Sequence, residues 1–208
     1  MITEELYKEI EKKYGSVASW AYWDKVGLKP KSNIGNMKLF NIKENPLLLQ
    51  TLKTNVVMIG LNFSRPVNFS ESFKNFHDSN PHAQDYKIRF AFQETIFYGA
   101  YMTDLIKNMP MKSSHELKTL LAKNKNIIDE NLKTFRRELF DIEAKDPIIL
   151  AFGVDVYEIL NQKLEKSEYS VLIKLTHYSQ QVSKEEYKAT VFRQIGEKYS
   201  GQITINKE

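Results

Sequence analysis

The segment "NVVMIG" at positions 55–60 decides the fold of this chain. It is a short apolar run with adjacent valines and a final glycine, which is typical of a strand buried in a parallel sheet. A second such run, "PIILAF" at 147–152, is followed by Gly153 and a helical pattern. Strands and helices that alternate along a chain form a mainly parallel sheet with helices on both faces. The sequence therefore predicts a three-layer α/β/α domain.

The other elements are found by working outward from these two strands. Two more strands are expected at 98–103 and 169–175, which makes a mainly parallel four-stranded sheet. Helical periodicity covers 85–93, 113–123, 127–143, 153–164 and 184–195. N-terminal helices are expected at 2–14, with Thr3 as the N-cap, at 16–24 and from Asn45 to Leu52. The polar stretch 61–84 shows neither helical nor strand periodicity and is expected to be a loop. A loop of that length usually has a function, unless the assignment is wrong.

The composition fits a single domain. With 208 residues, of which 42% are hydrophobic, the chain can bury a full core, and no repeat or linker divides it. We expect residues 54–195 to form the core, 1–53 to be a helical N-terminal decoration and 196–208 to be a short tail. The absence of cysteine excludes disulfides, Cys-ligated zinc, iron–sulfur clusters and a thiol nucleophile.

The termini and the charge bound the location and the partners. No secretion signal is recognisable at the N-terminus, and the longest apolar runs, 47–49 and 56–61, are too short to cross a bilayer. We therefore expect a soluble, cytoplasmic protein with no membrane partner. The formal net charge of +4 permits a polyanionic partner but is too small to establish one.

Polar side chains follow each of the four predicted strands. The groups are Asn62-Phe63-Ser64, Thr103-Asp104, Gly153-Val154-Asp155 and His177-Tyr178-Ser179. Three of these groups, taken alone, have a structural explanation: a turn for the first, a helix cap for Asp104 and a backbone-bound loop for His177. The carboxyl ends of parallel strands meet at one edge of the sheet, where such folds bind ligands. Their convergence therefore favours a functional site.

The standard catalytic signatures are missing from the sequence. It has no phosphate-binding loop, dinucleotide fingerprint, nucleophile elbow or H-E-x-x-H pair. His77, Asp78 and His82 are too few to indicate a metal, so we expect neither a metal nor a cofactor. The aromatic residues Trp20, Tyr22 and Trp23 are expected in the core rather than on a base-stacking surface.

Four segments together resemble the uracil-DNA glycosylase superfamily in order and spacing. They are "VVMIGLNFS" at 56–64, "GAYMTDLIKNMP" at 99–110, "PIILAFGVDVYEIL" at 147–160 and "KLTHYSQQVSKEEY" at 174–187. The resemblance covers residues 54–195 and implies the fold of that superfamily. It also implies a hydrolase for DNA repair that binds DNA and excises a damaged or deaminated base flipped from it.

The resemblance assigns roles to individual residues. Asn62 matches the asparagine that positions the attacking water, and His177 matches the histidine that hydrogen-bonds the departing base. For base binding it implies Asp104, Phe63 and a stacking aromatic, for which Phe76 is preferred over Phe69 and Phe73. The DNA contacts would be Ser64, Arg65, Ser179, Gln180 and Lys184. A basic rim would draw on Arg65, Lys74, Lys107, Lys112 and Lys184.

Two departures from the superfamily pattern change which base we expect the site to recognise and how wide we expect its pocket to be. Asp104 stands where related glycosylases have an asparagine whose amide pairs with uracil by donating and accepting. An ionised carboxylate only accepts, so it suits uracil N3–H but repels uracil O4. Buried without a partner, Asp104 would either be protonated or prefer a donor-rich edge such as that of an amino base. Phe63-Ser64 stands in place of Pro-Gly and narrows the pocket. These departures motivate an alternative, a non-catalytic module of the same fold that binds a nucleotide or nucleic acid. A protein-binding surface is a third reading, without a specific feature in its favour.

Overall fold

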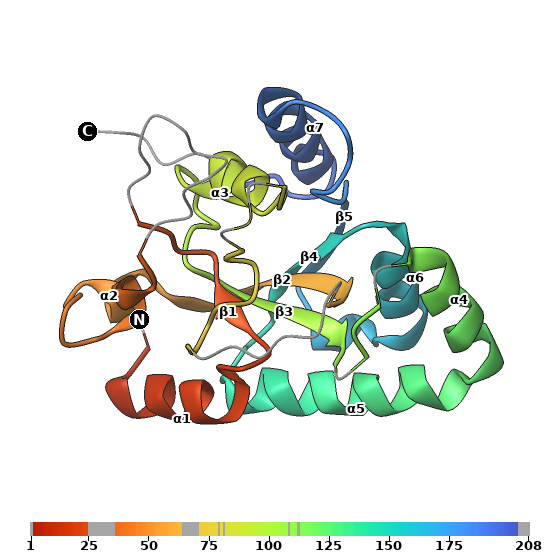
Figure 1. Ribbon diagram of the computed structural model, residues 1–208, viewed down its shortest axis with the longest axis horizontal. Coiled ribbons are helices and arrows are strands. Elements are labelled where there is room, and N and C mark those ends of the chain that lie inside the picture. Colours follow the sequence, from red (N-terminus) through yellow and green to blue (C-terminus); the bar gives the residue numbers. More distant parts are fainter. Residues whose placement is uncertain are drawn as a thin grey trace.

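A five-stranded mixed sheet forms the centre of the molecule, in the order β1-β3-β2-β4-β5 (Figure 1). The computed structural model describes residues 2–24, 36–63, 71–78, 80, 82–107, 109–111 and 113–203. The strands are β1 (Ser19–Trp20), β2 (Lys53–Asn62), β3 (Ala100–Ile106), β4 (Ile148–Phe152) and β5 (Val171–Leu175). Strands β3, β2, β4 and β5 run parallel to one another, as the sequence predicts.

The fifth strand, β1, corrects two predictions. It pairs antiparallel with β3, so the sheet is mixed and larger than the predicted four strands. The helix predicted at 16–24 is wrong, and residues 1–53 do not form a purely helical decoration, because β1 belongs to the sheet. A strand of two residues is too short to show a period. Its place is fixed by tertiary contacts, since the buried Trp20 ring lies edge-on to Tyr101 with centroids 5.1 Å apart.

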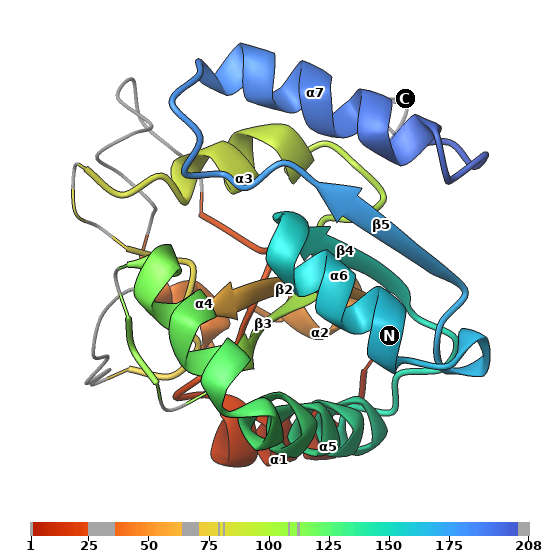
Figure 2. The same cartoon turned by 90° about the vertical axis from the view of Figure 1, so that its right-hand side faces the viewer.

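Helices cover both faces of the sheet, which confirms the three layers. The α-helices are α1 (Glu4–Tyr14), α2 (Leu48–Thr51), α3 (Tyr86–Phe92), α4 (Ser114–Lys123), α5 (Lys125–Asp141), α6 (Val154–Lys163) and α7 (Lys184–Gly196). Short 3-10 helices lie at Met37–Phe40 and Lys166–Glu168. Figure 2 shows α3 and α7 together above the sheet and α1 and α5 below it. No helix in the described ranges has the length and apolar character needed to span a membrane.

The N-cap predicted for the first helix is present in the structure, and two further helices have caps of the same kind. The Thr3 hydroxyl accepts a hydrogen bond from the Leu6 amide and caps α1, and Ser113 and Ser183 cap α4 and α7 in the same way. The helix expected from Asn45 is shorter than predicted, because α2 begins only at Leu48. Residues 71–78, in the predicted long loop, form neither helix nor strand.

Alternation along the central strands divides the core into two clusters. Val57 and Ile59 of β2 pack with α1, α5 and α6, whereas Val56 and Met58 pack with α3 and α7. In β3, Tyr101 and Leu105 belong to the first face and Met102 to the second. Successive side chains point to opposite faces of a strand, so Asp104 faces the α3 and α7 side.

Candidate functional site

The strand order places the candidate site at the carboxyl end of β2. From β2 the chain crosses to β3 on one side and then returns to β4 on the other side. Strands β2 and β4 therefore flank the point where the winding reverses, and open α/β sheets bind ligands in the crevice beyond such strand ends. At this edge lie Asn62, the last residue of β2, Phe63 after β2, Gly153 after β4, and the segment 176–183 after β5.

Asp104 lies inside β3, beside Gly60 of β2, so it neither follows the strand nor caps a helix. Its side chain is only 3% exposed, and its Oδ1 atom lies directly over Gly60. A Cβ atom on Gly60 would come within 2.2 Å of this Oδ1. The carboxyl group therefore occupies space that only glycine leaves free. Burial raises the pKa of Asp104 to about 6, although the Asn75 hydrogen bond and the Lys107 charge oppose this shift.

Asn75, which the sequence analysis missed, holds the Asp104 carboxyl group in place. Its Nδ2 donates to Asp104 Oδ2 at 3.0 Å and to the Val17 carbonyl at 3.0 Å. Its Oδ1 accepts from the Phe76 amide at 3.0 Å, so the orientation of the side-chain amide is fixed. An asparagine in a polar loop has no distinctive sequence signal, and its partner Val17 is 58 positions away.

A row of aromatic rings leads from the Asp104 carboxyl to His177. Phe76 Cε1 lies 3.7 Å from the position of a Cβ on Gly60, so the Phe76 ring edge and the Asp104 carboxyl both border Gly60. The Phe76 ring contacts Tyr178 edge-on, with centroids 6.3 Å apart, and Tyr178 stacks on His177 at 4.3 Å. Phe76 has a φ of 62°, which is strained for a phenylalanine. Among the three predicted stacking candidates, Phe76 is thus the one in contact with this row in the described residues.

The contacts of His177 settle which nitrogen carries its proton. The Ser179 amide donates to His177 Nδ1 at 3.1 Å, and the Ser179 hydroxyl lies 2.8 Å from the same atom. Because Nδ1 accepts, a neutral His177 has its hydrogen on Nε2 and can donate there. Burial lowers the pKa of His177, which favours this neutral form.

His177 also borders an open groove of about 390 Å³ beside the row of rings. Ser179, Gln180, Lys174 and Gly153 are among its lining residues. The buried Lys87 of α3 donates from Nζ to the Gln180 carbonyl at 2.5 Å and so holds the loop after β5. The structure therefore brings three predicted residues, His177, Ser179 and Gln180, to one hollow at the predicted edge.

Asn62 lies on the same face of β2 as Gly60 but makes contacts of its own. Its Nδ2 donates to the carbonyls of Phe63 at 2.8 Å, Met111 at 3.1 Å and Met109 at 3.4 Å. The Phe63 carbonyl also accepts from the Met111 amide at 3.0 Å, and the Phe63 side chain is buried. These bonds fasten the segment after β3 to the end of β2. They also turn Asn62 Oδ1 away from those carbonyls, so that Oδ1 can accept a hydrogen bond from water.

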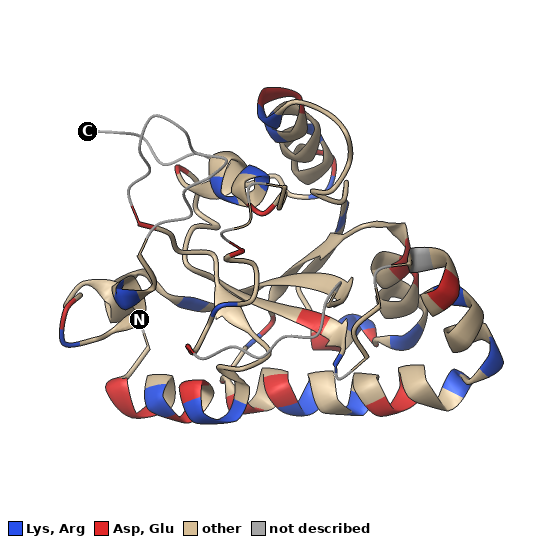
Figure 3. Cartoon of the chain, viewed as in Figure 1, with Lys and Arg blue, Asp and Glu red and all other residues tan. Residues whose placement is uncertain are grey.

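The predicted basic rim is not found among the described residues. Lys107 is wrong as a surface cation: it is buried, donates to the Asp104 carbonyl at 2.7 Å and pairs with Glu138 at 2.6 Å. Lys74 pairs with Glu71 at 2.9 Å, and Lys184 pairs with Glu185. Figure 3 shows that positively and negatively charged residues alternate along the helices. Ser64, Arg65, Phe69 and Lys112 lie outside the described residues.

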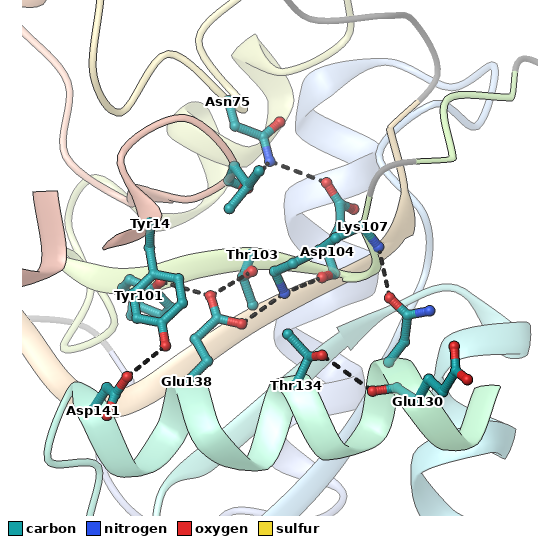
Figure 4. A network of polar contacts seen from close by, with 12 residues as sticks. Tyr14, Asn75, Tyr101, Thr103, Asp104, Lys107, Glu130, Thr134, Glu138 and Asp141 are labelled. Atoms are coloured by element: carbon teal, nitrogen blue, oxygen red, sulfur yellow. Dashed lines mark hydrogen bonds and ion pairs between the residues drawn. The ribbon is translucent and has the colours of Figure 1, made fainter. Parts of the chain in front are cut away.

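Glu138 of α5 is the centre of a second buried polar network, on the opposite face of β3 (Figure 4). Its Oε1 accepts from the Tyr101 hydroxyl at 2.7 Å and the Thr103 hydroxyl at 2.9 Å, and its Oε2 pairs with Lys107. The sequence held a signal for it. Glu138 lies between Phe135 and Leu139 on the apolar side of the helix predicted at 127–143.

The remaining candidates belong to the core. His77 is buried against Trp23, with Nε2 2.9 Å from the Tyr22 carbonyl and Nδ1 3.0 Å from the Asn75 carbonyl. Trp20 and Trp23 are buried as predicted. In the part of the chain that the structure describes, no three His, Asp or Glu side chains lie close enough together to hold a metal ion.

Comparison of the chain with protein-family models, curated proteins and solved structures finds no match. The arrangement of this chain's own residues is therefore the basis for assigning a function. In that arrangement Asp104 and Phe76 both border Gly60, Tyr178 lies between Phe76 and His177, and Asn62 lies at the end of the neighbouring strand.

Proposed function

We propose that this chain is a DNA glycosylase that hydrolyses the N-glycosidic bond of a damaged or deaminated base flipped from DNA. The observation that carries the proposal is the meeting of Asp104 and Phe76 over Gly60, joined through Tyr178 to His177. An acceptor, an aromatic face and a neutral imidazole donor are the groups needed to read an extruded base by its edge and its ring.

Each residue has a distinct part in this mechanism. The base stacks on Phe76 with its edge at Asp104, and His177 Nε2–H donates to the base as the bond from C1′ breaks and negative charge develops. Asn62 Oδ1 holds the water whose oxygen adds to C1′, and the proton it loses passes to solvent. Neither Asn62 nor His177 is a strong base, so the rate depends on stabilising the charge of the leaving base.

Binding requires a movement near Asp104. Asp104 is 3% and Phe76 4% exposed, so a base reaches the carboxyl and the Phe76 ring only after side chains around them move. The positive φ values of Phe73 (60°) and Phe76 (62°) place strain in this segment, which favours its rearrangement when a ligand replaces the contacts.

Excision assays test the proposal directly. Duplex and single-stranded oligonucleotides carrying uracil, hypoxanthine, xanthine or an oxidised pyrimidine are incubated with the protein, and alkali-labile strand breaks are counted. We expect breaks with at least one base, and a loss of roughly 100-fold or more in His177→Ala and Asn62→Ala. His115→Ala, on the exposed side of α4, is the matched control and should keep full activity. The absence of breaks with every base, or unchanged activity in both site variants, would refute the proposal.

The alternative of a non-catalytic binding module is favoured by one observation, the three carbonyl contacts that hold the Asn62 amide. They give Asn62 a structural role that would persist without catalysis. This alternative predicts salt-dependent binding of the same oligonucleotides with every glycosidic bond left intact.

A further inference from the structure

The Asp104 carboxyl group has one occupied oxygen and one that faces the site. Asn75 Nδ2 donates to Oδ2, and the fixed amide orientation keeps that donor in place. Oδ1 lies over Gly60, which the Phe76 ring edge also borders. Within the described ranges, Asn75 is the side chain that donates to this carboxyl group. A ligand that displaces the Phe76 edge therefore meets Oδ1 first.

The chemistry of Oδ1 determines which base edge it accepts. An ionised carboxylate has acceptors only, whereas an exocyclic amine is a donor and an exocyclic oxo group is an acceptor. In a buried site an acceptor that meets another acceptor is strongly disfavoured, because both have lost their water. The two kinds of base differ at the exocyclic group and at the adjacent ring nitrogen, and the exocyclic group is where an acceptor such as Oδ1 discriminates between them.

We propose that Asp104 selects a base that carries an exocyclic amino group and rejects its oxo-bearing counterpart. This inference rests on the proposed function, and it names the substrate class of that site. The selection requires Gly60, whose missing Cβ leaves the room for Oδ1. It also requires Asn75, which fixes the carboxyl group by binding the other oxygen.

Protonation of Asp104 would weaken the selection, because a protonated Oδ1 can donate to an oxo group. The charged groups that act on this carboxyl are Lys107, which lowers its pKa, and Asp85 and Glu138, which raise it. With a pKa of about 6, the group is mostly ionised at pH 7 and mostly protonated at pH 5. Discrimination is therefore stronger at the higher pH.

The test uses oligonucleotides that carry 5-hydroxycytosine or 5-hydroxyuracil, which differ only in the amino or oxo group and its ring nitrogen. Single-turnover excision and binding affinity are measured for the natural chain and for Asp104→Asn. In the variant the amide oxygen can take the Asn75 hydrogen bond, which leaves the amide NH2 over Gly60 to donate to an oxo group. Asp129→Asn, an exposed substitution on α5, is the matched control. Thermal unfolding shows whether each variant is folded.

We expect the natural chain to favour the amino base by roughly tenfold or more at about pH 7, and Asp104→Asn to reverse the preference. At about pH 5 the preference of the natural chain should shrink, while that of the variant stays constant. Excision with the same preference in all three proteins would overturn this inference and leave the proposed function standing. Reversed binding without excision would overturn the catalytic proposal and keep the recognition. No excision and no binding of either base would overturn both.

Discussion

Two buried carboxyl groups lie on opposite faces of β3 with unequal sets of partners. Glu138 receives two hydroxyl hydrogen bonds and the Lys107 ammonium, so both of its oxygens are paired. Asp104 receives a hydrogen bond from the Asn75 amide on one oxygen, and the other faces Gly60. A buried carboxylate needs several donors to offset the loss of water. The Glu138 carboxyl group thus stabilises the fold, whereas the Asp104 carboxyl group keeps one oxygen available to a ligand.

The two groups are connected through the backbone of β3. Lys107 Nζ bridges Glu138 Oε2 and the Asp104 carbonyl, so the stable network fixes the strand that carries the ligand-facing carboxyl group. This arrangement is common in binding sites, where a rigid support holds an incompletely satisfied group. Three stability measurements test this difference between the Glu138 and Asp104 carboxyl groups.

The largest effect is expected at Glu138. Glu138→Ala leaves Lys107 buried without its ion-pair partner, and we expect a loss of about 3–5 kcal/mol in the free energy of unfolding. Urea unfolding measures it, with the exposed Glu130→Ala on the same helix as the control. A loss no larger than that of the control would show that the network does not support the fold.

The next effect is a pH dependence at Asp104. Burial raises its pKa from 3.8 to about 6, so the folded protein holds this proton more tightly than the unfolded chain does. The stability it contributes is fully present below the unfolded pKa and is lost as the pH rises through the folded pKa. Between about pH 3.5 and about pH 7, the natural chain should lose roughly 2–3 kcal/mol relative to Asp104→Asn.

Urea unfolding across this pH range checks the sign. For Asp129, whose pKa is lowered by Lys163, the dependence should run in the opposite direction. Parallel stability curves for the natural chain and Asp104→Asn would mean that the Asp104 carboxyl is as well solvated as an exposed one.

The smallest effect is expected at Gly60. The Cβ of Gly60→Ala would collide with Asp104 Oδ1, and we expect a loss of about 1–3 kcal/mol. In an Asp104→Ala background the same change should cost much less, because the colliding atom is gone. Gly196→Ala, whose Cβ would meet no atom within 4 Å, is the control. Additive losses in the double variant would contradict the close approach of Gly60 and Asp104.

The sequence predicted the fold well because its signals are long or repeated. The four apolar strands and the helices α1, α4 and α7 were identified from their periodicity, with a predicted cap residue, Thr3, at α1 alone. Strand β1 was not, since two residues have no measurable period and Trp20 is placed by distant contacts.

The site was predictable in its location but not in its inner contacts. Residues expected after the predicted parallel strands included His177 and Asp104 as site candidates. Asp104 lies inside β3 rather than after it. Lys107 was misassigned to the surface, because sequence alone does not show that a lysine has a buried partner such as Glu138, 31 positions away. The Asn75 contact likewise depends on a loop conformation that no local pattern encodes.

The central claim is that a base is held between Phe76 and Asp104. A crystal structure of the His177→Ala variant bound to an oligonucleotide with 5-hydroxycytosine tests it most directly, since this variant should bind the base without excising it. We expect the base to be extruded, its ring to lie on Phe76 and its amino nitrogen to lie about 3 Å from Asp104 Oδ1. A base that stays stacked in the DNA, or binds elsewhere while Phe76 still covers Asp104, would contradict the claim.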